Sequence, residues 1–304
     1  MSFKVFLELV EIKAKTASVL PFLLGVGFSY YYYHAFQWQL ALYFFIAMFL
    51  FNMAVDAWDN YNDYHHALDK KVYRQKTNII GREQLSPNLV LALLVIMTVI
   101  ASGIGLYLVF RTGWPLLWLG LFCFGVGIVY SAGPRPLSSL PLGEVFSGFT
   151  MGFMITLITI YINTYQTFAW DLRELSKILL LALPNMLWIS NLMLANNLCD
   201  LAEDEKNKRY TLVHYLGKVR ALKLYTLKDI LALVFLALTP FLGLAPYTVL
   251  LVLLALPFFY RQNRIFQAKQ VKRETFITAV RTLAVGSTLQ VVCYFLGIII
   301  ETIF

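Results

Sequence analysis

Three aspartates follow one of the most apolar runs of the sequence, in the segment FNMAVDAWDNYNDYHHALD at residues 51–69. On a helix with 100° per residue, one asparagine and these three aspartates lie at about 0°, 40°, −20° and 20°, in the order Asn52, Asp56, Asp59 and Asp63. All four side chains therefore share one narrow helix face, which carries a carboxamide and three carboxylates.

A second segment, LANNLCDLAEDEKNKRYTL at residues 194–212, repeats this arrangement. Four side chains fall within about 100° of arc on a helix: Asn196, Asn197, Asp200 and Asp204. Both clusters end an apolar run and enter a basic loop, so they lie on the same side of a membrane. We expect the two clusters to meet around one cavity.

The chemistry of these two faces favours a magnesium site. Like charges near a bilayer are costly, about 2.5 to 3.5 kcal/mol for a centrally placed aspartate, unless a cation neutralises them. Carboxylates and asparagine carbonyls, with no histidine or cysteine on either face, are hard oxygen ligands of the kind that bind Mg²⁺ together with a substrate phosphate. Basic residues in the same loops are available as phosphate donors: Lys208, Arg209 and Arg135. The simpler alternative is that the aspartates only mark where a helix meets water and that the loop cations only reflect topology.

The composition requires elements that cross a membrane. Of 304 residues, 59% are hydrophobic and 14% are charged, and the apolar runs reach about 20 residues, the length that spans a hydrocarbon core of roughly 30 Å. We expect an all-α integral membrane protein, a single domain over residues 1–304, with about nine helices around a central cavity. The expected spans are 16–34, 38–56, 88–110, 114–131, 143–163, 177–197, 224–242, 246–260 and 281–300.

The basic loops set the expected orientation. Lysine and arginine concentrate in the loops at 64–86, 201–222 and 261–279, whereas the opposite connections are short or nearly uncharged. By the positive-inside rule, those loops, the loop at 132–142, the cavity opening and the N-terminus are cytoplasmic, and the C-terminus is outside a cell membrane. The net charge of +8 is then mostly a topology signal that also favours anionic lipid or substrate, and nucleic acid is not expected as a partner.

Several motifs resemble the UbiA superfamily of intramembrane aromatic prenyltransferases. VDAWDNYND at 55–63 is similar to its first Asp-rich signature, and NNLCDLAEDEKNKRYTLVHYLG at 196–217 is similar to the second motif of the 1,4-dihydroxy-2-naphthoate polyprenyltransferases of menaquinone synthesis. YSAGPRPLSSLPLGE at 130–144 and KAKTASVLPFLLG at 13–25 resemble two further family segments. The resemblance covers nearly the whole chain in order.

The resemblance implies transfer of a polyprenyl group from polyprenyl diphosphate to 1,4-dihydroxy-2-naphthoate, with release of diphosphate and CO₂. It implies that Mg²⁺ is held by the carboxylates of both clusters, which are Asp56, Asp59, Asp63, Asp200 and Asp204. It further implies that the substrates contact Asn52, Asn196, Asn197, Lys15, Tyr130, Arg135, Lys208 and Arg209. Three positions depart from the family pattern: Ala14 replaces a proline, Val55 an asparagine and Cys199 an arginine. Either Arg209 or Arg135 compensates for that arginine, or the acceptor differs.

Other functions remain open at the level of sequence. A prenyltransferase for 4-hydroxybenzoate, haem or another lipid acceptor uses the same features. An ion-coupled secondary transporter also needs intramembrane aspartates, although its acids belong near the bilayer midplane rather than beside basic loops. A CDP-alcohol phosphotransferase has an Asp-rich Mg²⁺ site too, but its glycine-containing signature is missing from this sequence.

Overall fold

The computed structural model describes residues 1–66, 73–133 and 135–303. Asp69, Lys70 and Lys71, which belong to the expected cytoplasmic loop at 64–86, lie outside the described residues. All regular elements of the described residues are helical. The lead and first half contain α1 (Phe3–Leu9), η1 (Ile12–Lys15), α2 (Thr16–Tyr33), α3 (Trp38–His66), η2 (Tyr73–Thr77), α4 (Ile79–Arg82), α5 (Pro87–Thr112), α6 (Trp114–Ser131) and η3 (Leu137–Ser139).

The second half continues with one interrupted helix and several long ones. They are α7 (Gly143–Ser147), η4 (Gly148–Met154), α8 (Ile155–Thr164), α9 (Leu172–Lys206), α10 (Leu212–Leu216), α11 (Lys218–Leu238), η5 (Tyr247–Ala255), α12 (Leu256–Ala268) and α13 (Phe276–Ile303). A helical bundle is the expected result, because a helix satisfies its backbone hydrogen bonds internally where no water is available.

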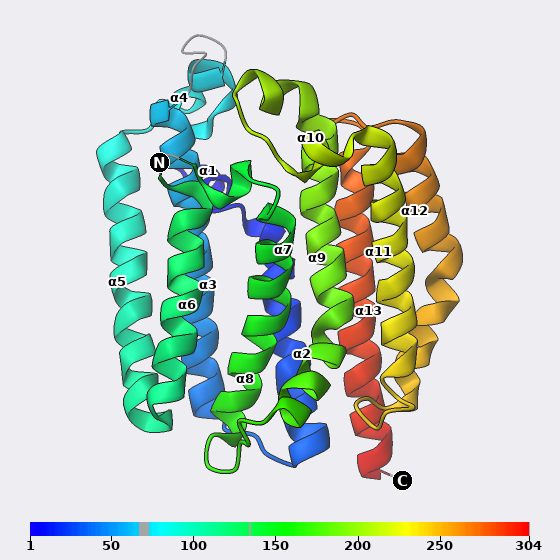
Figure 1. Ribbon diagram of the computed structural model, residues 1–304. Helices are drawn as coiled ribbons and strands as arrows, with labels where there is room; N and C mark the ends of the chain where they lie inside the picture. The colour runs from blue at the N-terminus through cyan, green and yellow to red at the C-terminus, as the bar shows by residue number, and fades with distance from the viewer. Residues whose placement is uncertain (67–72, 134, 304) are drawn as a thin grey trace.

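Seven helical segments of the described residues are long and apolar enough to cross a membrane. They coincide with seven of the expected spans. The other two expected spans correspond to α2 and α11, which run alongside the rest of the bundle (Figure 1). The multi-pass helical architecture is therefore confirmed, while the count of nine spans stays a prediction.

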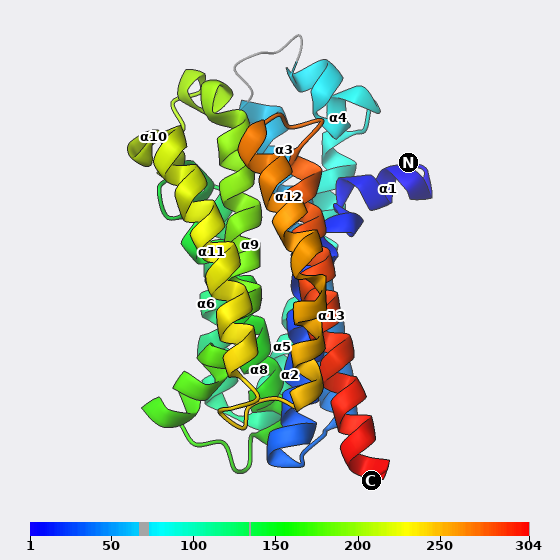
Figure 2. The ribbon, with the colours of Figure 1, turned by 90° about the vertical axis from the view of Figure 1, so that its right-hand side faces the viewer.

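The connections divide between the two ends of the bundle. In Figure 1, α4, α10 and the link from α12 to α13 lie at the upper end, near the N-terminus, whereas the C-terminus lies at the lower end. Figure 2 shows α1 projecting sideways from the bundle near that same upper end. The described parts of these expected cytoplasmic loops thus share one end of the molecule.

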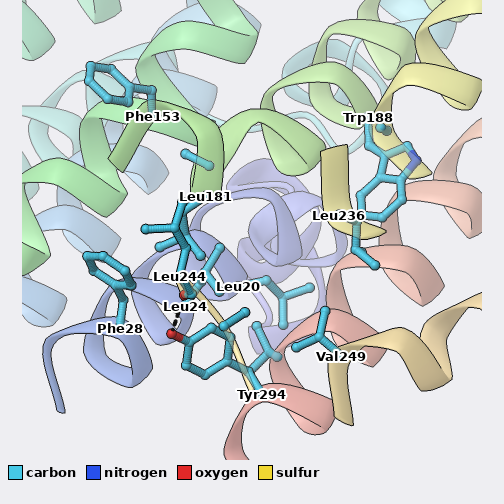
Figure 3. Close-up of a cluster of buried hydrophobic side chains, with 14 of the residues drawn as sticks. Leu20, Leu24, Phe28, Phe153, Leu181, Trp188, Leu236, Leu244, Val249 and Tyr294 are labelled. Carbon is cyan, nitrogen blue, oxygen red and sulfur yellow. Dashed lines mark hydrogen bonds between the residues drawn. The ribbon is translucent and has the colours of Figure 1, made fainter. Parts of the chain in front are cut away.

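The main core lies between α2, α8, α9, η5 and α13, where large apolar side chains interlock (Figure 3). Tyr294 is buried there, and its hydroxyl donates a hydrogen bond of 2.8 Å to the Leu244 carbonyl (Figure 3). Two glycines bring η4 against α9, because a Cβ at Gly148 would lie 2.5 Å from the Met186 carbonyl oxygen and one at Gly152 would lie 2.7 Å from the Met186 Cα. This contact fixes the wall formed by α7 and η4 against the helix that carries the second acidic cluster.

Polar bonds tie α11 to its neighbours inside the bundle. Asp229 accepts hydrogen bonds from Asn191 of α9, at 2.8 Å, and from Asn263 of α12, at 3.0 Å. The adjacent Lys228 donates to the Ser190 hydroxyl at 2.7 Å. These charged side chains are satisfied within the protein, as burial in an apolar region requires.

Candidate active site

The two acidic faces border one cavity of about 1780 Å³. The wall contributed by α3 contains Asn52, Asp56, Asp59 and Asp63, and the wall contributed by α9 contains Asn196 and Asp200. The cavity-lining residues of α3 run from Phe44 to Asp63, a length of roughly 28 Å at 1.5 Å per residue. Beyond the acidic end, the lining is predominantly apolar. The two clusters therefore share one cavity through the four residues of α3 and through Asn196 and Asp200 of α9, whereas Asn197 and Asp204 do not line it.

The other walls come from α5, α6, α8 and α13. Gly105 of α5 and Gly120 of α6 line this cavity, and a Cβ added at either position would meet no heavy atom within 4 Å. The cavity is therefore wide at these two positions, and neither glycine is required by a packed neighbour.

Lys15 contacts the first acidic cluster. The residue is 3% exposed, and its Nζ donates to the Asn52 carbonyl oxygen at 3.2 Å and contacts the Asp56 carboxylate. The N-terminal lead positions it, since η1 ends at Lys15 directly before α2 begins. The ammonium thus bridges two residues that are one helical turn apart on α3.

Lys272 contacts the second acidic cluster in a similar way. Its Nζ lies 2.5 Å from Asp200 Oδ2 and contacts Asn196 Oδ1. Asn196 and Asp200 are also one helical turn apart, and Lys272 belongs to the link between α12 and α13. Each acidic face therefore has a lysine on its aspartate, but only Lys272 also binds the asparagine side chain, because Lys15 donates to the backbone carbonyl of Asn52.

Two predicted site residues lie behind the cavity wall. Asp204 is buried and forms an ion pair of 3.3 Å with Arg209 Nε, while Arg209 itself lines the cavity. Asn197 is also buried, and its amide donates to Glu144 Oε1 at 2.9 Å. Neither Asp204 nor Asn197 is among the cavity-lining residues, so in this structure both support neighbouring groups.

Three further residues were predicted to contact the substrates, and one of them lines the cavity while the other two do not. Tyr130 lines the cavity at the end of α6, and its buried hydroxyl has no hydrogen-bond partner within the described part of the chain. Arg135 and Lys208 are exposed and do not line the cavity. Arg209 is therefore better placed than Arg135 to replace the charge missing at Cys199, whose own side chain packs against the apolar cluster around Leu198 and Val213.

Sequence reasoning missed Lys272, Glu11 and Glu144. Lys272 had no local signal, because a lysine in a basic loop is already explained by topology. Glu11 lines the cavity from the lead segment and is exposed to solvent; partial desolvation by the surrounding protein, together with repulsion from Asp56, raises its pKa to about 7. Glu144 is the last residue of the motif at 130–144. The sequence alone does not single it out, and the structure does so because Glu144 is buried between α7 and α9, where Asn197 donates a hydrogen bond to it.

The acidic faces fit a divalent cation chemically. In residues 1–66, 73–133 and 135–303, no three histidine, cysteine or acidic side chains are grouped closely enough to hold a metal ion. Asp56 and Asp200 are each already in contact with an ammonium group, which shows that both carboxylates attract a cation. Carboxylate and carboxamide oxygens at a cavity that also holds basic residues suit Mg²⁺ bound with an anionic ligand.

Comparison with known proteins places this fold and site in context. Residues 18–284 match the UbiA prenyltransferase family. The chain belongs to this family. The resemblance inferred from the motifs is therefore confirmed over most of the sequence.

Relatives within the UbiA family agree in sequence and in structure. The chain is 30% identical over 213 residues to the 1,4-dihydroxy-2-naphthoate octaprenyltransferase of Bacillus subtilis (strain 168), and the match covers 69% of this chain and 65% of that relative. The apo structure of a UbiA homolog from Aeropyrum pernix K1 has a TM-score of 0.70 at 17% identity and covers 95% of this chain and 98% of its own. A UbiA homolog from Archaeoglobus fulgidus bound to GPP and Mg²⁺ has a TM-score of 0.69 at 13% identity, with 97% and 99% covered.

Proposed function

We propose that this UbiA family member transfers a polyprenyl group from polyprenyl diphosphate to an aromatic acceptor within the membrane. The observation that carries the proposal is the position of two acidic helix faces at one end of a long, mostly apolar cavity. An anionic head group and an apolar tail need these two environments in one continuous space.

The acidic end is assigned to Mg²⁺ and the diphosphate. Asp56, Asp59, Asp63 and Asp200 would hold the metal from the cavity wall, and Asp204 would contribute from behind it through Arg209. Bound Mg²⁺ supplies charge neutralisation that makes diphosphate a better leaving group. Lys15 and Arg209 add charge-assisted donors for the phosphate oxygens.

The apolar part of the cavity is assigned to the polyprenyl tail. Its lining excludes water from the allylic carbon and orients the tail along α3. In the reaction, the carbon–oxygen bond to diphosphate breaks and a carbon–carbon bond to the electron-rich ring forms, while the ring loses the group it carried at that carbon. The unpartnered Tyr130 hydroxyl lies at the acidic end, where it can bind the acceptor.

The acceptor proposed is 1,4-dihydroxy-2-naphthoate, as in menaquinone biosynthesis, with loss of its carboxylate as CO₂. Two points support this choice: the second motif at 196–217, and the activity named for the Bacillus subtilis relative. The match spans 65% of that relative's length, so the acceptor belongs to the proposal rather than to the family assignment.

The proposal includes the cellular setting. We place the protein in the cell membrane as a single prenyltransferase domain over residues 1–304, with the acidic end of the cavity and the N-terminus facing the cytoplasm and the C-terminus outside. The basic loops at that end of the bundle support this orientation through the positive-inside rule.

A competition assay tests the function. Purified protein is incubated with Mg²⁺, a radiolabelled polyprenyl diphosphate, and equal amounts of 1,4-dihydroxy-2-naphthoate and 4-hydroxybenzoate. We expect a decarboxylated prenyl-naphthalenediol as the main product and no product when EDTA removes the metal. A preference for 4-hydroxybenzoate would reject the acceptor but keep the reaction class, and metal-independent turnover would reject the proposed site.

A further inference from the structure

Lys272 is the cation in direct contact with the second acidic cluster on the cavity side of α9. Its Nζ touches both Asn196 and Asp200, and all three residues line the cavity. The residue precedes α13 and lies 76 positions from Asn196 in the sequence. Lys272 is therefore close to Asn196 and Asp200 only because the chain folds, and not because the residues are close in sequence.

The link that carries Lys272 is held in shape by its own hydrogen bonds. The Thr275 hydroxyl accepts from the Val271 amide at 2.9 Å, and the Thr275 amide donates back to the Val271 carbonyl at 2.8 Å. The Lys272 ammonium also lies 4.8 Å from the centre of the Phe276 ring, within the range of a cation–π contact. The side chain is thus directed toward α9 by a preorganised turn.

The cations near the acidic end are mostly paired. Arg209 is paired with Asp204, Lys15 with Asp56 on the opposite wall, and Lys272 with Asp200, while Arg273, next to Lys272, also lines the cavity. Position 199, one residue before Asp200, is an uncharged cysteine that packs away from the cavity. Among the described residues, Lys272 is the cation bound to the cavity-lining asparagine and aspartate of α9.

The two lysines differ in their contacts. Lys15 is buried and binds the backbone carbonyl of Asn52 and the Asp56 carboxylate on α3, whereas Lys272 binds the side-chain oxygens of Asn196 and Asp200 on α9. An ammonium group has three donors, so it can keep a bond to the protein while donating to a phosphate oxygen. The side chain of Lys272 is 43% exposed, which leaves part of its surface accessible from the cavity.

We propose that Lys272, on the α12–α13 link, binds the diphosphate of the donor substrate beside Asn196 and Asp200 of α9. This inference rests on the proposed function and adds a substrate-binding residue to it. The competing role is that of a counter-ion that only neutralises Asp200 until a metal binds.

The test measures binding without turnover. Inorganic diphosphate is titrated in the presence of Mg²⁺ into wild-type protein and into Lys272→Met, Lys272→Gln and Lys272→Arg variants, with isothermal titration calorimetry as the readout. Methionine keeps the apolar stem over Phe276 and removes the charge, and arginine keeps the charge. The control is Lys269→Gln in the same link, where an exposed lysine pairs with Glu274 at 2.6 Å.

We expect both charge-removing variants to weaken Mg²⁺–diphosphate binding by at least roughly tenfold, the value of one charge-assisted hydrogen bond. Lys272→Arg and Lys269→Gln should stay within about threefold of wild type. In steady-state assays, Lys272→Met should raise the KM for polyprenyl diphosphate and leave the KM for the acceptor unchanged. Thermal unfolding of each variant without metal checks that the fold is kept.

Two results would overturn the inference in different ways. Unchanged or tighter binding in Lys272→Met, with wild-type protein binding normally, would identify a counter-ion and leave the proposed function intact. If wild-type protein itself fails to bind Mg²⁺ and diphosphate, the proposed function and this inference both fall. Should Lys272→Met not fold, equal binding by wild type and Lys272→Gln would reject the inference in the same way.

Discussion

Asn197 Nδ2 lies 2.9 Å from Glu144 Oε1 and joins α9 to α7 inside the bundle. Both residues are buried, and the other carboxylate oxygen of Glu144 has no hydrogen-bond partner among the residues that the structure describes. Within the described residues, the buried Glu144 carboxyl group therefore depends on this hydrogen bond from Asn197. The bond lies next to the turn of α9 that holds Asn196 and Asp200.

Replacing Asn197 with leucine should lower the stability of the protein. The change leaves the buried Glu144 without a donor, at a cost of about 1–3 kcal/mol. Thermal unfolding in detergent should show a lower Tm for Asn197→Leu, whereas Asn207→Ala at the exposed end of α9 should match wild type. A Tm for Asn197→Leu equal to that of wild type would contradict this role.

Asp59→Asn and Asp200→Asn should each lose activity and keep the fold. Asparagine is nearly isosteric and removes charge from a repulsive cluster, but the metal contributes several kcal/mol of transition-state stabilisation and each 1.36 kcal/mol is about tenfold in rate. We expect Mg²⁺-dependent product formation to fall by at least roughly a hundredfold. Asp171→Asn is the matched control, because Asp171 caps the opposite end of α9 by accepting from the Glu174 amide at 2.8 Å and asparagine caps equally well. Near-normal turnover in both cavity variants would show that these aspartates have no role in catalysis and lie only where a helix meets the membrane surface.

Lys15 and Asp56 should be energetically coupled. Lys15→Met leaves a carboxylate inside the site without its ammonium partner, and Asp56→Asn leaves a buried ammonium. The double variant removes both charges, so its loss of stability should be smaller than the sum of the single losses by about 0.5–3 kcal/mol. Unfolding of the four proteins without Mg²⁺ measures the coupling, and simple additivity would show that the contact is energetically neutral.

Glu11 should make stability depend on pH. Although Glu11 is exposed to solvent, partial desolvation by the surrounding protein raises its pKa from 4.5 to about 7; repulsion from Asp56 and Asp63 acts in the same direction, and attraction by Lys15 and Lys272 opposes it. Because the folded pKa is raised, the folded state binds more protons than the unfolded chain between about pH 4.5 and 7, and the stabilising contribution present at low pH is lost as pH rises through this window.

Glu11→Gln should remove that pH dependence. Relative to wild type, the variant should gain stability at pH 8 compared with pH 5, as measured by Tm across a pH series in metal-free buffer. Glu274→Gln, at an exposed ion pair with Lys269, serves as the control. Parallel Tm curves for wild type and Glu11→Gln would assign the pH dependence to other groups.

The orientation predicts protection of the α9–α10 link. A single cysteine is introduced by Asn207→Cys after the three native cysteines are replaced with alanine. An impermeant maleimide should label it only after the membrane of intact cells is breached. Efficient labelling from outside would reverse the proposed topology.

Local periodicity predicted part of the site well. The carboxylates of α3 and of Asp200 followed from residue spacing on single helices, and their shared cavity followed from the parity of the spans. Lys272 could not be predicted in this way, because its partner Asn196 is 76 residues away and its basic loop had a sufficient explanation in topology. The burial of Asp204 and Asn197 could not be predicted either. A helical wheel shows which residues share a face of α9, but it does not show which neighbouring elements cover part of that face. In the lead before α2, Lys15 was expected at the site only through the resemblance of residues 13–25 to a family segment, and Glu11, which also lines the cavity, was not expected there.

The open space beside Gly105 and Gly120 bears on how this enzyme family can diversify. Under the proposed function, a side chain at either position would enter the space assigned to the tail, and its Cβ would meet no heavy atom within 4 Å. Under the proposed function, substitutions at these two positions are therefore one route by which related enzymes could differ in the length of tail that they accept.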